Sequence, residues 1–186
     1  MTDRPRVTSI LAECGLGPDF SRVDSAVLEE ARARGCQLHA LAEAHAYSYL
    51  DEADITPPVA PYFSAYLKFL AESGHEPIAS ELEVIHPAWQ YVGHLDRVGW
   101  MAGRRGIIDY KTGESVDLRA AGCQLAGYRL AWNASRPTEP VDWIGVLQLK
   151  ADGTYRYHDI PHAEHEPVFL AACVIWQARH RKETTA

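Results

Sequence analysis

The spacing of apolar residues changes at Gly74, and no other feature of the sequence constrains the fold as strongly. Before that glycine, apolar residues recur every three or four positions, the period of a helix that buries one face. We expect helices over residues 24–35, 36–53 and 58–73, separated at Gly35 and ended at Gly74. Residues 1–22 lack this pattern, and we interpret them as a loosely structured lead-in to one domain over 23–186.

Beyond Gly74, short runs rich in Ile, Val, Trp and Tyr indicate strands joined by tight turns. We expect strands over 77–86, 89–101, 106–111, 143–150 and 154–160, and helices over 118–132 and 164–180. Strands and helices in this order predict an α/β or α+β fold, in which a sheet is flanked by helices.

The composition is that of a globular protein, with 47% hydrophobic and 23% charged residues. The longest apolar run, Val168–Trp176, is far shorter than the roughly 20 residues that a membrane helix needs. The N-terminus MTDRPRVTSI lacks the features of a signal peptide, so we expect a cytoplasmic protein. The four cysteines form no C-x-x-C pair, and we expect small buried side chains rather than disulfides.

The net charge of −7 argues against a protein that coats nucleic acid without specificity. The charge is uneven, however, because residues 97–136 hold seven basic and three acidic side chains. Two interpretations of this basic segment stand equally: it meets an anionic substrate, or it is an ordinary solvated face.

Acidic residues interrupt two of the apolar strands. Asp109 and Lys111 are two positions apart on one strand, so their side chains point to the same face. Pairing with the preceding strand would bring Asp96 near Asp109, and two such carboxylates repel unless a cation lies between them. Oxygen ligands of this kind suit Mg²⁺ or Mn²⁺. The alternative is an exposed ion pair at a strand end, and Glu81 is either a further acid of this site or a solvent-facing residue.

Two helical pairs accompany these strands, and neither is informative alone. His39 and Glu43 are four residues apart, as are Gln124 and Tyr128, so each pair shares a helix face. Taken in chain order, however, the whole set resembles the RecB-like branch of the PD-(D/E)XK nuclease superfamily. The matching residues are His39 with Glu43, Glu81, Gly93 with Asp96, Asp109-Tyr110-Lys111, and Gln124 with Tyr128.

This resemblance covers residues 35–130 and implies a restriction-endonuclease-like α/β (α+β) core, with a central mixed sheet flanked by helices. It implies that Asp96 and Asp109 are the principal ligands of a divalent metal ion, joined by His39 and the backbone carbonyl of Tyr110. Lys111 would orient the attacking water and hold the scissile phosphate, and Glu81 resembles an acid near the metal in some members.

The resemblance also implies how DNA is held. Gln124 and Tyr128 resemble the motif that steadies the lysine, the water or the DNA backbone. The basic segment supplies phosphate contacts that position DNA without reading its sequence. The candidates for these contacts are Arg104, Arg105, Arg119 and Arg129.

The expected activity is a Mg²⁺- or Mn²⁺-dependent deoxyribonuclease, an exonuclease of recombination or repair that resembles the compact phage-type enzymes. An endonuclease of the same superfamily and a non-cleaving protein that binds DNA ends or a partner are the alternatives. The cysteine spacing does not match the iron–sulfur cluster of some RecB-like nucleases, so we expect none. DNA is the expected partner, with a recombinase, an annealing protein, a helicase or further copies of this chain as additional candidates.

Overall fold

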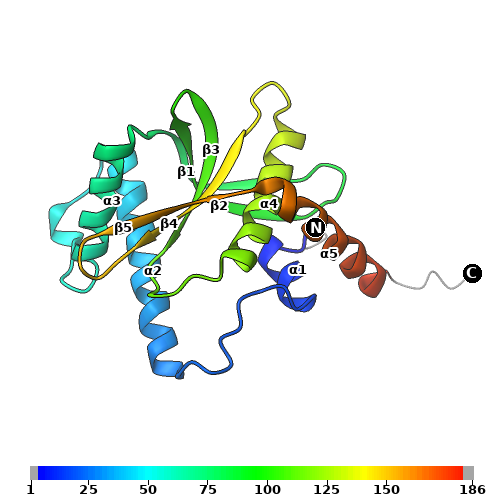
Figure 1. The fold of residues 1–186 in the computed structure, drawn as a ribbon, viewed down its shortest axis with the longest axis horizontal. Helices are drawn as coiled ribbons and strands as arrows, with labels where there is room; N and C mark the ends of the chain where they lie inside the picture. Colours follow the sequence, from blue (N-terminus) through cyan, green and yellow to red (C-terminus); the bar gives the residue numbers. More distant parts are fainter. Residues whose placement is uncertain (1–3, 182–186) are drawn as a thin grey trace, which may run out of the picture.

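A computed structural model describes residues 4–181 as one mixed sheet with helices on both faces (Figure 1). The strands lie in the order β1-β2-β3-β4-β5, and each neighbouring pair is antiparallel except the parallel pair β3 and β4. Their bounds are β1 Glu76–Ile85, β2 Val92–Met101, β3 Arg104–Lys111, β4 Trp143–Leu149 and β5 Tyr155–Ile160. The parallel pair requires a crossover, which α4 (Leu118–Ser135) provides. The predicted α+β class with a central mixed sheet is therefore confirmed.

The two faces of the sheet are covered by different helices (Figure 1). Helices α1 (Val7–Glu13), α4 and α5 (His162–His180) pack on one face, and α2 (Ser25–Ala46) and α3 (Ala60–Ser73) pack on the other. Side chains alternate across a strand, so neighbours such as Ile107 and Ile108 belong to different hydrophobic clusters. A side chain of β2 or β3 therefore faces either α1, α4 and α5 or α2 and α3. None of the described helices combines the length and apolar content that a membrane crossing needs.

The prediction of a break at Gly35 is wrong, because α2 runs without interruption from Ser25 to Ala46. Asp24 caps the helix by accepting a hydrogen bond from the Ala26 N–H at 2.8 Å. A glycine within a helix costs only about 1 kcal/mol relative to alanine, which the burial of Leu38 and its neighbours offsets. The helix also ends seven residues before the predicted boundary at 53, where the chain turns into the short 3₁₀ helix Glu52–Asp54.

The prediction of a loosely structured lead-in is also wrong, because Val7–Glu13 form α1. Its apolar residues Val7, Ile10 and Leu11 are buried in the cluster that α4 and α5 share. A helix this short carries only one apolar triplet, so its periodicity cannot be separated from chance in the sequence. The N-terminal segment is therefore part of the core on the α4 side of the sheet.

Candidate active site

The candidate site lies where β2 and β3 cease to pair. Their register runs from Met101 opposite Arg104 to Arg97 opposite Ile108. At the next position the Asp96 side chain, rather than the backbone, receives the hydrogen bond, because its Oδ2 accepts from the Tyr110 N–H at 2.7 Å. This hydrogen bond fixes the buried Asp96 carboxylate near Asp109 of β3.

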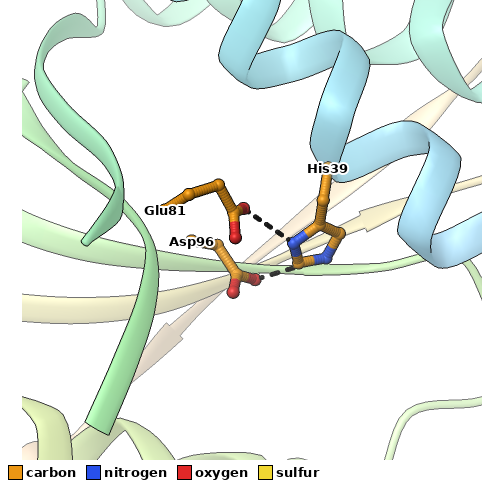
Figure 2. A group of neighbouring side chains, drawn as sticks. All are labelled: His39, Glu81 and Asp96. Atoms are coloured by element: carbon orange, nitrogen blue, oxygen red, sulfur yellow. Dashed lines mark hydrogen bonds and ion pairs between the residues drawn. The ribbon is translucent and has the colours of Figure 1, made fainter. Parts of the chain in front are cut away.

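Three side chains from three different elements converge on this place: His39 of α2, Glu81 of β1 and Asp96 of β2 (Figure 2). Each offers one ligand atom, and these atoms lie within 4.8 Å of one another. The His39 Nδ1 lies 2.9 Å from the Glu81 Oε1, and its Nε2 lies 3.6 Å from the Asp96 Oδ2. Carboxylate oxygens with one imidazole can hold a divalent cation.

The backbone at Glu81 is unusual. Glu81 lies between Ser80 and Leu82, both paired with β2, and its φ is 49°, in the left-handed region that glutamate rarely occupies. The Tyr47 hydroxyl accepts a hydrogen bond from the Ser80 N–H at 3.2 Å, immediately before this kink. Such strained residues persist where the surrounding structure fixes them, and they cluster at functional sites.

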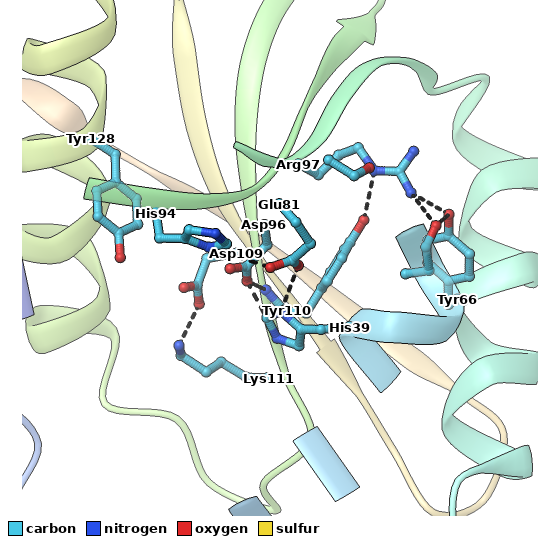
Figure 3. A network of polar contacts seen from close by, with 12 residues as sticks. His39, Tyr66, Glu81, His94, Asp96, Arg97, Asp109, Tyr110, Lys111 and Tyr128 are labelled. Atoms are coloured by element: carbon cyan, nitrogen blue, oxygen red, sulfur yellow. Dashed lines mark hydrogen bonds and ion pairs between the residues drawn. The ribbon is translucent and has the colours of Figure 1, made fainter. Parts of the chain in front are cut away.

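A second group of contacts surrounds Asp109, which points to the same face of the sheet (Figure 3). Its Oδ2 lies 2.6 Å from the Lys111 Nζ, and its Oδ1 accepts a hydrogen bond from the Gln124 Nε2 at 2.9 Å. Gln124 also donates to the Tyr128 hydroxyl at 3.0 Å. The structure thus joins the predicted Asp–x–Lys motif of β3 to the Gln–Tyr pair of α4.

The glycine of the G-x-x-D motif has a packing reason. A Cβ on Gly93 would lie 2.5 Å from the Tyr128 Cδ1, so only glycine allows that ring to lie against β2. The glycine of the motif therefore makes room for the Tyr128 ring, and the aspartate of the motif is the site residue Asp96.

The acidic and basic side chains of this site shift one another's pKa. Burial lowers the pKa of His39, but Asp96, Glu81 and Asp109 outweigh burial and raise it to about 9. Burial raises the pKa of the Asp96 carboxyl, and Asp109 adds to that rise. Burial also lowers the pKa of Lys111, but Asp109 and Asp96 outweigh it, so the pKa is raised. The protein therefore gathers several acids in a poorly solvated place, where they favour any neighbouring positive charge.

His94 is a member of the site that the sequence analysis missed. Its Nδ1 lies 3.3 Å from the Glu81 Oε2, whereas His39 contacts the other oxygen of that carboxylate (Figure 3). The only signal was its place inside the G-x-x-D motif, two residues before Asp96. Alternation along the strand places both on one face.

Tyr110 lies between the acid and the lysine of β3, with its ring on the opposite face. Its hydroxyl accepts a hydrogen bond from the buried Arg97 Nε at 3.0 Å. Its backbone N–H donates to the Asp96 Oδ2, so Tyr110 forms hydrogen bonds on both faces of the sheet.

The four predicted phosphate contacts lie away from this group. Arg104 and Arg105 are at the far end of β3 from Lys111, where Arg105 lies over the Trp100 ring. Arg119 lies in the first turn of α4, in a separate hollow beside His165. Arg129 pairs with Glu166 and donates to the Val141 carbonyl at 2.9 Å. Within residues 4–181, none of the four lines the cleft at the candidate site.

That cleft has a volume of about 910 Å³ and opens onto His39, Glu81 and Asp96. Its walls come from the N-terminal segment, α2, β1, β2 and Tyr128 of α4. Four of its lining residues, Arg4, Arg6, Val7 and Thr8, fall in the segment 1–22 that was predicted to be a lead-in.

Comparison with protein families identifies the superfamily of this chain. The family model of the PD-(D/E)XK nuclease superfamily matches residues 11–174, and the chain belongs to this superfamily. No curated protein matches the chain. A solved structure described as the crystal structure of SSO0001 is similar over 79% of this chain and 74% of its own, with 13% identity and a TM-score of 0.37. That likeness is too weak to carry an argument.

Proposed function

We propose that this protein is a metal-dependent deoxyribonuclease that hydrolyses phosphodiester bonds at the cleft of His39, Glu81 and Asp96. The observation that carries the proposal is the convergence of these ligands beside the Asp109–Lys111 pair. Membership of a nuclease superfamily supports the reaction class and DNA as the substrate.

The donor set fits a divalent cation. His39, Glu81 and Asp96 have ligand atoms close together. The resemblance adds Asp109 and the Tyr110 carbonyl as proposed ligands, and the whole set offers mainly oxygen, which favours Mg²⁺ or Mn²⁺. The raised pKa of Asp96 supports this assignment, because it marks a carboxylate whose charge the protein compensates poorly. A cation bound here would lower the pKa of a bound water and offset the charge of the phosphate.

Besides the metal ligands, Lys111 is the proposed catalytic residue. Its Nζ is held by Asp109 at 2.6 Å, and its side chain is about one-third exposed. An ammonium at this place orients the attacking water and stabilises negative charge on the phosphate in the transition state. Gln124 steadies Asp109 from the α4 side and thereby fixes the partner of the lysine.

An exonuclease of recombination or repair is the proposed form of this activity. The ordered motifs that resemble the RecB-like branch and the size of 186 residues support it. A cytoplasmic location, additional copies of this chain, and a recombinase, annealing protein or helicase as partner stay predictions of the sequence.

End-labelled linear DNA and closed circular DNA, each single- and double-stranded, test the proposal when incubated with Mg²⁺, Mn²⁺ or EDTA. We expect metal-dependent loss of linear DNA alone, because an exonuclease has no end to start from on a circle. Lys111→Ala should lower the rate about 10³-fold by removing one stabilising charge.

Lys150→Ala is the matched control, since Lys150 lies in the exposed turn between β4 and β5. It should cleave at the rate of the wild type. Cleavage of circles would replace the exonuclease with an endonuclease. Absence of cleavage with either metal would overturn the nuclease proposal and leave a protein that binds without cutting.

A further inference from the structure

The cleft at the candidate site has a positively charged wall that comes from the N-terminal segment. Among the described residues that line it, the only lysine or arginine side chains are Arg4 and Arg6. The same cleft is lined by His39 and by the acids Glu81 and Asp96. A ligand in the cleft therefore meets both guanidinium groups and carboxylates.

The backbone that carries these arginines is fixed. The Val92 N–H donates to the Pro5 carbonyl at 2.9 Å, and Arg6 forms a parallel bridge with Val92. Directly after them, Val7 is buried in the core and begins α1. Arg6 has an extended backbone, with φ −79° and ψ 148°. In an extended segment, alternate side chains share a side, so Arg4 and Arg6 project together.

Both guanidinium groups are left available. Both arginines are exposed, and neither has a carboxylate within ion-pair distance in the part of the chain that the structure describes. Arg4 donates to the Gln90 Oε1 at 3.1 Å, which uses one of its five N–H groups. Arg97 and Arg129, by contrast, are engaged by internal acceptors.

We propose that Arg4 and Arg6 bind backbone phosphates of the DNA strand whose scissile bond lies at the acid group. The inference rests on the proposed nuclease function and extends it to how substrate is held. Guanidinium groups match phosphate oxygens with paired hydrogen bonds. They also offset the repulsion between DNA and an acid-rich cleft in a chain of net charge −7. Arg4 and Arg6 thus add phosphate contacts at the cleft from the N-terminal segment, outside the basic residues 97–136.

The salt dependence of DNA binding tests this proposal. Labelled duplex DNA is titrated with protein in Mg²⁺ over a series of salt concentrations, in the Lys111→Ala background so that bound DNA stays intact. Each phosphate contact contributes about 0.9 to the slope of log K against log salt. Adding Arg4→Ala and Arg6→Ala should reduce the magnitude of the slope by about 1.8, two such contacts.

A charge-matched control removes two exposed cations at the opposite edge of the sheet, Lys150→Ala with Arg156→Ala. This variant should keep the slope of its parent. Arg4→Lys with Arg6→Lys should also keep the slope, because the charges remain, while binding more weakly than the arginines. Arg4→Gln with Arg6→Gln replaces the alanine pair if alanine disturbs α1, and thermal unfolding of every variant checks the fold.

An unchanged slope in the alanine and glutamine pairs would overturn the inference. A change in Mn²⁺ affinity without a change in slope would also overturn it, since the arginines would then only balance the acid group. Cleavage by the wild type with an unchanged slope leaves the nuclease standing and removes this inference alone. A wild type that neither binds nor cuts DNA overturns both.

Discussion

Two polar groups lie back to back across strands β2 and β3, and they differ in how their charges are satisfied (Figure 3). Asp96 and Arg97 are consecutive, as are Asp109 and Tyr110, so each strand sends one side chain to each face. The acids face α4, the cleft and His39 of α2, whereas the arginine and tyrosine face α3 and the Ala42 carbonyl of α2. We call the first the open group and the second the closed group.

The closed group satisfies a buried charge with neutral acceptors. Arg97 is 1% exposed and donates to the hydroxyls of Tyr110 and Tyr66 and to the Ala42 carbonyl. Ala42 lies near the C-terminal end of α2, where the helix dipole is negative. No carboxylate pairs with Arg97 within residues 4–181. These bonds join α2, α3 and β3, so the closed group is structural.

The open group gathers charges that repel one another. Glu81, Asp96 and Asp109 share a small space, and burial raises the pKa of Asp96. An arrangement of this kind is unfavourable for folding alone and is typical of a functional site. The comparison therefore predicts opposite responses when each group is neutralised.

The largest effect is expected for Asp96→Asn. Activity should fall about 10³-fold or more, because a proposed metal ligand and its charge are lost. Stability without metal should not fall. A raised carboxyl pKa means that ionised Asp96 opposes folding above its ordinary pKa, and asparagine removes that charge while its carbonyl still accepts from Tyr110. Metal-dependent cleavage and urea unfolding in EDTA measure the two quantities.

Asp142→Asn is the control, since Asp142 is an exposed acid outside the cleft. It should change neither quantity. A large loss of stability in Asp96→Asn would show that the open group holds the fold together, and the contrast with the closed group would disappear.

The second prediction concerns Arg97→Met, which should do the opposite. Removing the guanidinium leaves two hydroxyls and a carbonyl without their buried donor, so the free energy of unfolding should fall by about 3 kcal/mol or more. Mn²⁺ affinity of the folded protein should change little, because Arg97 contacts none of the proposed side-chain ligands. Urea unfolding and isothermal titration test both parts, with the exposed Arg32→Met as control.

Retained stability in Arg97→Met would mean that the closed group is dispensable. A complete loss of Mn²⁺ binding in a folded variant would mean that it acts on the site, and either result would end the division between the two groups.

The sequence revealed the open group better than the closed one, for a physical reason. Asp109, Lys111, Gln124 and Tyr128 follow strand and helix spacing, which are local rules, and the structure brings them together. Arg97 was counted among the basic residues of 97–136, because its burial depends on α2 and α3, which no local pattern places.

The same limit explains the other residues that the sequence analysis missed. The kink at Glu81 depends on pairing with β2 and on Tyr47, two contacts distant in the chain. Arg4 and Arg6 reach the cleft only because the short helix α1 packs against α4 and α5. The spacing of apolar residues predicts the order of strands and helices. The positions of these side chains depend on tertiary packing, which local spacing does not reveal.

The smallest predicted effect concerns His75, which lies on the same face of the sheet as the closed group. His75 lies on that face beside Phe69 and Trp143, and burial, followed by the charge of Arg97, lowers its pKa to about 4. The unfolded chain binds a proton near pH 6.5 and the folded protein does not, so stability should fall as pH drops from about 6.5 to 4. The loss attributable to His75 should be about 2 kcal/mol at pH 5.

His75→Leu should remove this part of the pH dependence, because within residues 4–181 neither ring nitrogen has a hydrogen-bond partner to lose. Urea unfolding at pH 7.5 and pH 5 measures it, and Val174→Leu, at an exposed position of α5 that does not titrate, should keep the wild-type dependence. In Arg97→Met the difference between the two pH values should shrink, since one cause of the lowered pKa is gone. An identical pH dependence in the wild type and His75→Leu would show that the charge of Arg97 does not reach His75. The closed group would then extend no further than its hydrogen bonds.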